Sequence, residues 1–375
     1  MNEPENAAAA ETGTTGGEAP DFRLIPSRTF APWLRSVGGS IAFTTYQVGK
    51  LFLIGINPET GRLSVYERNF PRCMGFGVDQ TPARTTLWMS SLYQLWRMEN
   101  FLGQGETSSD GHDAVFVPVE GRTTGDIDIH YIHPMQGSAA PLFVATRFNC
   151  LATLDHRNSF QPVWLPPFID RVAAEDRCHL NGLAMRDGAA AYVTCVSTTN
   201  AAGAWRDHRQ SGGVLIDVAS GEVVASGLSM PHSPRLHDGQ LYLLQSGLGE
   251  FGRIDLATGR FESLCFLPGF VRGVSFAGTH AIIGVSRPRK DRTFEGLRLN
   301  DRLEAEGRGA VSMIAIVNLG TGDIEHMLEI QGVVQELYDV AFLRGIRRPK
   351  LLGFKTPEIR FQIRPAPFRR EPPAP

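Results

Sequence analysis

Short runs of hydrophobic, β-branched and aromatic residues recur along the chain, each about the length of a strand and bounded by Gly, Asp, Asn or Pro. Such runs predict strands joined by tight turns. They fall into sets of four, and residues 74–120 (MGFGVDQ, TTLWMSSL, YQLWRMEN and AVFVPVE) are a clear example. Helical periodicity is absent except in the charged segment 292–307, so the pattern predicts an all-β protein.

Two of the sets, residues 178–224 and 230–262, are copies of one pattern. Each turns at an Asp-Gly pair, and their later turn glycines, Gly221 and Gly259, lie 38 residues apart. Four-stranded units that repeat every ~40–50 residues are typical of a β-propeller. No crossover helices separate the strands, which excludes an alternating βαβ fold.

The two ends of the chain predict how the ring closes. The first set, residues 40–68, has only three strands, and a leading strand without a blade of its own follows the last set at residues 336–345. Pairing that strand with the first three makes one composite blade and removes both exposed edges. We therefore predict six blades, or seven if residues 23–33 and 351–355 add strands.

A single propeller domain is expected over residues 22–356. Residues 1–21 are mostly Ala, Glu, Gly and Thr with almost nothing to bury, so they are expected to be disordered. Residues 357–375 are rich in Arg and Pro and are expected to lie extended on the surface.

Composition narrows the class of protein. With a net charge of −2, the chain as a whole is not expected to bind nucleic acid or an anionic membrane by electrostatic attraction. No run of residues approaches the ~20 consecutive apolar residues that a membrane-spanning helix needs. The five cysteines form no CxxC pair, and the N-terminus does not resemble a secretory signal. We expect a soluble cytoplasmic protein with reduced thiols and neither nucleic-acid nor membrane partners.

Candidate chemistry lies where polar residues interrupt the leading strands, which line the channel of a propeller. Aligning these strands places one layer at Met74, His130 (or Ile129), Asn181, His232, Arg272, and Tyr338 or Asp339, with Arg72, Cys73 and His179 just before it. Buried polar groups cost free energy unless they are paired or bind something. Polar residues in a wet channel can also simply hold water. The predicted ligand-binding residues are His130, His179, Asn181, His232, Arg235, Arg272 and Asp339.

This set allows three kinds of chemistry. The imidazoles of His130, His179 and His232 could ligate a divalent metal with oxygen from Asn181 or Asp339, and Asn181, His179 and His232 are the metal candidates. Arg235 and Arg272 could clamp a carboxylate or phosphate. In a catalytic version, His232 would be a general base oriented by Asp339 or Glu336.

Other features carry less chemistry. Ser233 and Ser246 lack the GxSxG context of a serine hydrolase. Two long insertions, residues 194–213 and 286–309, are expected to be either lids over a site or solvated connections.

Several long motifs, among them TTYQVGKLFLIG, HLNGLAM and MPHSPRLHDGQLYLLQSGLGEFGRID, resemble an uncharacterised bacterial family of conserved hypothetical proteins with a propeller-like strand pattern. The resemblance covers about residues 28–345 and implies no activity. HLNGLAMRDG also resembles the NGL segment of gluconolactonase and regucalcin-like six-bladed propellers, which implies that Asn181 binds a divalent cation. The chain departs from that pattern, because His232 and Arg272 stand where those enzymes supply carboxylates.

The sequence therefore supports three hypotheses. The first is a propeller that binds a small molecule or peptide, possibly an anionic one, at the channel mouth. The second is a metal-assisted hydrolase or lactonase-like enzyme that uses the same ring of residues. The third is a protein-interaction scaffold whose channel is inert.

Overall fold

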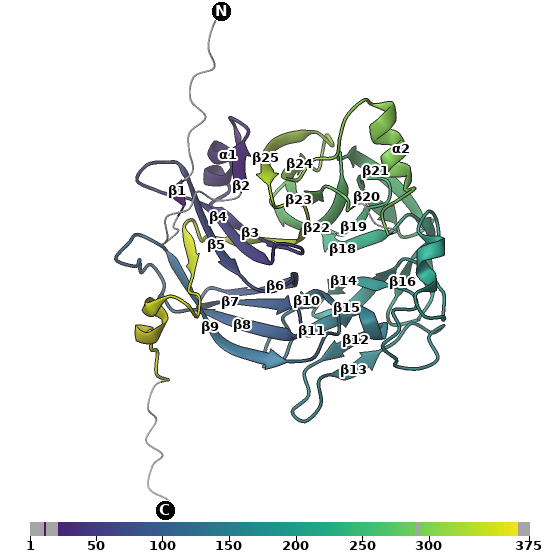
Figure 1. Ribbon diagram of the computed structural model, residues 1–375, viewed down its shortest axis with the longest axis horizontal. Helices are drawn as coiled ribbons and strands as arrows, with labels where there is room; N and C mark the ends of the chain where they lie inside the picture. Colours follow the sequence, from purple (N-terminus) through teal and green to yellow (C-terminus); the bar gives the residue numbers. More distant parts are fainter. Residues whose placement is uncertain (1–10, 13–21, 290–292, 367–375) are drawn as a thin grey trace, which may run out of the picture.

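The computed structural model describes residues 11–12, 22–289 and 293–366, and within them the strands form six sheets around a central channel (Figure 1). Each sheet contains four antiparallel strands, which are consecutive in the sequence in five sheets and come from both ends of the chain in the sixth. The first strands of neighbouring blades contact one another around the axis. The six-bladed β-propeller predicted from the repeats is confirmed.

The blades are numbered in the order of the ring, starting from the composite blade. Blade 1 consists of β26 (Leu337–Arg344), β3 (Gly39–Thr45), β4 (Lys50–Ile56) and β5 (Leu63–Asn69). Blade 2 consists of β6 (Cys73–Thr81), β7 (Arg84–Ser91), β8 (Gln94–Asn100) and β9 (Ala114–Thr123). Blade 3 consists of β10 (Ile129–His133), β11 (Leu142–Ala145), β12 (Cys150–Thr153) and β13 (Gln161–Trp164). Blade 4 consists of β14 (Leu180–Arg186), β15 (Ala189–Cys195), β16 (Gly213–Asp217) and β17 (Val223–Leu228). Blade 5 consists of β18 (Pro231–His237), β19 (Gln240–Gln245), β20 (Glu250–Asp255) and β21 (Arg260–Phe266). Blade 6 consists of β22 (Phe270–Ala277), β23 (His280–Ser286), β24 (Met313–Asn318) and β25 (Ile324–Gly332).

The composite blade closes the ring as predicted, because β26 pairs antiparallel with β3. The two segments that might have formed a seventh blade instead extend existing ones. β2 (Phe22–Pro26) pairs with β25 of blade 6, and β27 (Pro349–Leu351) pairs in parallel with β9 of blade 2. The short helix α1 (Phe30–Ser36) follows β2 and packs beside β25 (Figure 1).

The predicted terminal tails are only partly described. Within residues 1–21, the structure describes only β1 (Glu11–Thr12), which pairs in parallel with β5. At the other end, η3 (Pro357–Phe361) is a short 3-10 helix, and residues 367–375 lie outside the described range. All five cysteines are free thiols. No helix among the described residues is long and apolar enough to cross a membrane.

The hydrophobic core is divided among the interfaces between neighbouring blades. Alternate side chains of each strand pack against the blade before or after it, as Leu53 of blade 1 and Phe76 of blade 2 do in one shared cluster. The pleat of a strand places successive side chains on opposite faces, so each blade contributes to two such clusters. The core therefore stabilises the ring as a whole rather than any one blade.

An additional cluster joins the two long insertions. It contains Trp205 of η2 (Ala204–His208) from the first insertion, and Phe294 and Leu299 from the second, which carries α2 (Arg298–Ala305). The Arg209 guanidinium also donates to the Thr293 carbonyl at 2.7 Å. The insertions pack together beside Phe270 at the start of β22, so they form a wall on the channel side of blades 4 to 6.

The register of every first strand shifts close to its start. A β-bulge or similar irregularity of this kind redirects side chains and is frequent beside functional sites. The shifts lie between Cys73 and Phe76, Ile129 and Tyr131, Leu180 and Gly182, His232 and Arg235, Arg272 and Val274, and Leu337 and Val340.

Five inter-blade hydroxyl bonds connect these irregular edges to the preceding blade. In each, a Ser or Thr hydroxyl at or just after the end of a second strand donates to a backbone carbonyl near the start of the next blade's first strand. The bonds are Thr44 to Met74 (2.6 Å), Ser90 to Ile129 (3.0 Å), Thr146 to Leu180 (2.6 Å), Ser246 to Val271 (2.6 Å) and Ser286 to Leu337 (3.1 Å). They satisfy edge carbonyls that would otherwise be buried without a partner.

We expect Thr44→Val to lower the free energy of unfolding by about 1–3 kcal/mol. Valine keeps the shape of the side chain but leaves the Met74 carbonyl without its donor and the Asp339 amide without its acceptor. Denaturant unfolding followed by tryptophan fluorescence measures the change. The matched control is Thr81→Val, because the Thr81 hydroxyl is exposed. Equal effects of the two substitutions would show that the inter-blade bond contributes nothing specific.

Candidate functional site at the channel mouth

A ring of side chains from five blades surrounds the channel near the starts of the first strands. The His130 and His179 rings lie 4.9 Å apart between centroids, and those of His179 and His232 lie 6.4 Å apart. The ring continues through Phe270 to the Arg272 guanidinium, which lies 5.0 Å from the centre of the Tyr338 ring. Tyr338 in turn lies 5.3 Å from His130.

Below this ring the channel is nearly filled. A cavity of about 10 Å³ remains there, lined by His130, Tyr131, Asn181, His232, Ser233, Arg235, Arg272, Tyr338 and Asp339. That volume is at the lower limit for one water molecule. A larger ligand can therefore reach the imidazoles only from the mouth beside them, and Asn181 and Asp339 are buried too deeply to contact it. Arg235 is 15% exposed and also lines a pocket of about 390 Å³ that later residues of the first strands form at the other end of the channel.

The deep residues do not fit a divalent cation. Asp339 lies 3.8 Å from the Arg235 guanidinium, so a positive charge already stands beside this carboxylate. The Asn181 amide oxygen accepts the Thr194 hydroxyl proton at 2.7 Å. Among the described residues, His130, His179 and His232 also do not bring their ring nitrogens within 4.8 Å of one another. The donor set and its geometry therefore do not match the metal that a metal-assisted hydrolase would need in this ring.

The inter-blade hydroxyl bonds fix the tautomers of two histidines. The Thr146 hydroxyl uses its proton on the Leu180 carbonyl, so at 2.7 Å from His130 Nδ1 it accepts a proton from the ring. Ser246 holds His232 Nδ1 in the same way at 3.0 Å. Both Nδ1–H groups also face a carbonyl two residues earlier, at Asp128 and Met230. Nε2 of each ring is left as a hydrogen-bond acceptor.

Burial keeps both rings uncharged. It lowers the pKa of His130 well below its usual value, and the nearby His179 lowers it further. Burial followed by the Arg272 charge does the same to the pKa of His232. His232 Nε2 is buried and has no hydrogen-bond partner among the described residues, so it is an acceptor aimed at the channel without a donor from the protein.

His179 is held differently, by a carboxylate. Its Nδ1 lies 3.1 Å from both oxygens of Asp176, and Trp205 Nε1–H donates to the same carboxylate at 2.8 Å. Burial acts to raise the pKa of Asp176, but the His179 ring and these hydrogen bonds lower it overall. The His179 ring also stacks on Trp205 at 4.1 Å. Asp176 therefore fixes the orientation of His179 and leaves its Nε2 available.

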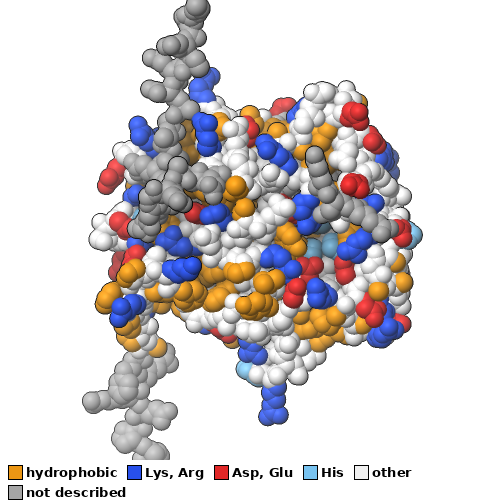
Figure 2. Space-filling model, in the orientation of Figure 1, with side chains coloured by type: hydrophobic (Ala, Val, Ile, Leu, Met, Phe, Trp, Pro, Cys, Tyr) orange, Lys and Arg blue, Asp and Glu red, His pale blue; other side chains and the backbone are white. Residues whose placement is uncertain are grey.

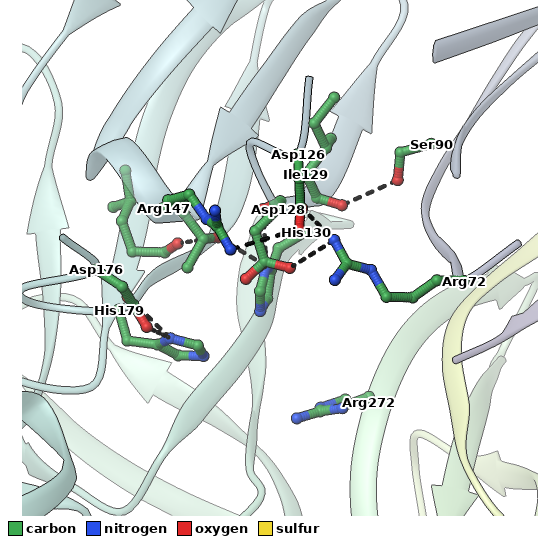
Figure 3. Close-up of polar contacts among 12 residues, drawn as sticks. Arg72, Ser90, Asp126, Asp128, Ile129, His130, Arg147, Asp176, His179 and Arg272 are labelled. Carbon is green, nitrogen blue, oxygen red and sulfur yellow. Dashed lines mark hydrogen bonds and ion pairs between the residues drawn. The ribbon is translucent and has the colours of Figure 1, made fainter. Parts of the chain in front are cut away.

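The rim of the mouth carries paired charges. Asp126 forms ion pairs with Arg72 and Arg147, and Figure 3 shows it between them. On the opposite side, Glu336 pairs with Arg272 at 2.9 Å and with Arg289 at 3.2 Å. Figure 2 shows histidine side chains near the centre of this face, with acidic and basic side chains around them. The basic charges of the mouth are compensated within the protein.

Backbone strain also concentrates at the mouth. Asp128, His179 and Met230 have positive φ values of 60°, 53° and 45°, and each precedes a cavity-lining residue of a first strand by two positions. Arg72, with φ of 47°, precedes the buried Met74 in the same way. Non-glycine residues occupy this left-handed region at a cost, and such residues cluster at functional sites. The repeated conformation aims a carbonyl at Nδ1 of both His130 and His232.

The structure brings the seven sequence-predicted site residues together along the channel, but not in one layer. His130, His179, His232 and Arg272 belong to the ring, Asn181 and Asp339 lie below it, and Arg235 extends toward the other end of the channel. Met74 is buried and lies outside the cavity lining.

The predicted pairing of His232 with Asp339 or Glu336 is not formed. Asp339 accepts from the Phe76 and Val340 amides and faces Arg235. Glu336 is committed to arginines. Sequence reasoning missed Asp176, the carboxylate that does orient a histidine, although its position three residues before His179 was a usable signal.

Comparison with known protein families gives a match over most of the chain. The sequence model of the family described as Domain of unknown function (DUF4915) matches residues 28–352. No curated protein matches the sequence.

Solved structures with similar architecture share little sequence. A chain of a crystal structure of a nidogen/laminin complex has 11% identity and a TM-score of 0.51, over 82% of this chain and 100% of that chain. A protein of unknown function from Bacteroides caccae has 12% identity and a TM-score of 0.47, over 82% and 99% of the two chains. At such identities the likeness extends to the fold alone.

We expect long-range ¹H–¹⁵N spectra to show His130 and His232 uncharged at pH 6, with the proton on Nδ1. The reason is that burial lowers both pKa values while neighbouring oxygens hold the Nδ1 protons. Thr146→Val should change the ring signals of His130 and leave those of His232 in place, because Thr146 contacts only the former. A charged ring or an Nε2–H form at pH 6 would contradict the assignment.

We expect Asp339 to make stability fall as the pH rises from 4 to 6. Burial raises its pKa from 3.8 to about 6, so between these values the unfolded chain releases a proton that the folded chain retains. The loss amounts to about 3 kcal/mol or less. Asp339→Asn removes this titrating group. The free energy of unfolding of the wild type minus that of the variant should therefore decrease as the pH rises from 4 to 6. Denaturant unfolding at pH 4, 5, 6 and 7 measures it, and a constant difference would refute the shift.

Proposed function

We propose that the chain, which belongs to the DUF4915 family, binds a small polar molecule or a peptide in the mouth of its channel. The observation that carries this proposal is the group of three imidazoles at the base of the mouth. Each has its Nδ1 held by an oxygen of the protein, and in the uncharged rings of His130 and His232 this leaves Nε2 as a hydrogen-bond acceptor. A pocket of convergent polar groups with shifted pKa values is a reasonable place to expect a ligand.

The chemistry of the mouth favours a ligand that donates hydrogen bonds. Neutral imidazole acceptors complement hydroxyl, amide or ammonium groups. The anionic ligand suggested by the sequence is less favoured, because Arg272 is paired with Glu336 and Arg235 lies below the imidazole ring beside Asp339. A second anion would have to compete with these carboxylates for the guanidinium groups.

The wall made by the two insertions supports the imidazoles rather than offering free apolar surface. Phe294 packs edge-on against Phe270 at 4.9 Å, Trp205 covers one face of His179, and all three aromatic side chains are buried at 1–2% exposure. The ligand that we infer is therefore defined by its hydrogen-bond donors, as in an amino-acid derivative, a short peptide or a modified sugar.

A thermal-shift experiment tests the proposal with defined probes: amino acids, dipeptides, amino sugars and polyols, with citrate and phosphate as anionic counterparts. Donor-rich probes should raise the melting temperature in a concentration-dependent way. His179→Ala should weaken the binding of any positive probe about tenfold, the loss expected for one hydrogen bond of about 1.4 kcal/mol.

The matched control is His237→Ala, because His237 lies at the far end of β18 and stacks on Phe276 away from the mouth. Binding that survives His179→Ala unchanged would place the ligand elsewhere. If no probe shifts the melting temperature, the scaffold hypothesis gains support.

The Asp176–His179 pair favours general-base catalysis as a second candidate function. A carboxylate that orients an imidazole with a free Nε2 can assist the removal of a proton from water or a hydroxyl group. The same panel, extended with simple esters and lactones, separates the two functions. Turnover that is lost in His179→Ala while probe binding is only weakened would favour an enzyme.

A further inference from the structure

We propose that His280, Glu325 and His326 form a zinc site on blade 6, independent of the channel. His280 begins β23, whereas Glu325 and His326 lie near the start of β25. Since the first strand of the blade, β22, starts at the mouth, the hairpin that leads from it to His280 lies at the opposite side of the ring. The proposed site is therefore remote from the residues assigned to ligand binding and does not depend on them.

The three potential ligand atoms are already close together. Glu325 Oε2 lies 2.8 Å from His280 Nε2 and 4.0 Å from His326 Nε2, and the ligand atoms of the group all lie within 4.8 Å of one another. Zinc–nitrogen and zinc–oxygen bonds of about 2.0–2.2 Å in a tetrahedral site separate ligand atoms by about 3.4 Å. The observed separations bracket this value, so small side-chain rotations would suffice to bind the ion.

Neighbouring groups already orient the ligands as metal sites require. Asn318 Nδ2 donates to Glu325 Oε1 at 2.8 Å, which leaves Oε2 for the ion. The Thr29 hydroxyl lies 2.7 Å from His326 Nδ1 and holds the ring through that nitrogen. Nε2 of His326 is the nitrogen that faces Glu325 Oε2. Such outer contacts fix the tautomer and orientation of metal-ligating side chains.

Burial and donor type point to zinc rather than to calcium or magnesium. The side chains of His280 and His326 are 15% exposed, and that of Glu325 is 35% exposed, so an ion can reach the cluster from solvent. The indole of Trp33 lies against both imidazoles, at 5.8 and 5.6 Å. Two imidazoles and one carboxylate suit zinc and leave a fourth position for water or another ligand, whereas calcium and magnesium prefer oxygen alone.

The experiment uses the full chain, freed of any histidine tag and dialysed against chelator. Titration with Co²⁺ should produce the visible absorption of a tetrahedral site at one equivalent, and Zn²⁺ should abolish it by displacement. Co²⁺ should also quench part of the tryptophan fluorescence. That quenching should disappear in Trp33→Phe, since Trp33 contacts both ligating rings.

Two substitutions test the ligands. His326→Ala and Glu325→Gln should each weaken zinc binding at least tenfold, with circular dichroism confirming that both variants fold. His156→Ala, an exposed histidine between β12 and β13 of blade 3, is the matched control and should bind zinc as the wild type does.

Three outcomes would overturn the proposal. They are the absence of binding by the wild type at micromolar zinc, binding that survives both ligand substitutions, and binding that is lost in His179→Ala but retained in His326→Ala. The last outcome would assign the metal to the channel instead.

Discussion

The structure depends on hydrogen bonds between a hydroxyl group on one blade and a backbone carbonyl on the next. The first strand of every blade is an edge strand, and its register is broken near the mouth, so its backbone groups lack regular partners there. A buried carbonyl without a donor costs free energy, and Ser or Thr from the preceding blade supplies one at five junctions. At two of these junctions, Thr146 and Ser246 also accept the Nδ1 proton of a channel histidine. The contact that holds neighbouring blades together therefore also sets the chemistry of the mouth.

Charge in the mouth is arranged so that no single sign dominates. Arg72 and Arg147 face Asp126, while Arg272 and Arg289 face Glu336. Under the proposed function, a mouth compensated in this way would discriminate among ligands by the direction of hydrogen bonds and by shape rather than by net charge. The buried cluster of the two insertions holds this arrangement in place, because Trp205 stacks on His179 and Phe294 packs against Phe270.

The repeated pattern of strands and turns made the architecture predictable from the sequence. The β-bulges of the first strands made part of the site unpredictable. Evenly spaced turns and an unpaired leading strand were sufficient to predict six blades and the composite blade that closes the ring. The strands β2 and β27 leave little trace in this pattern, because each only adds an edge strand to a complete blade. Bulges break the period of two on which the alignment of first strands relied. This is why both Tyr338 and Asp339 line the cavity, where the alignment offered one or the other.

Other features of the two sites depend on contacts between strands that are distant in the sequence, which the residue pattern alone does not predict. His179, rather than its aligned neighbour Asn181, completes the ring of imidazoles. The tautomers of His130 and His232 depend on hydroxyl groups from other strands. His280 and Glu325 are 45 residues apart in sequence, and only the pairing of β23 through β24 to β25 brings them together.

The composite blade has a consequence for the order in which the protein can fold. β3 gains its inner partner only when β26 has been made, almost 300 residues later in the chain. Blades 2 to 6 can form as each is completed during synthesis, but the ring cannot close until the end. Until then β3 presents an unpaired edge to solvent and to other chains. We therefore expect the pairing of β3 with β26 to be the slow step of folding, because it brings together two strands separated by almost the whole chain. A chain re-joined so that β26 directly precedes β3 would remove this delay while keeping every blade unchanged.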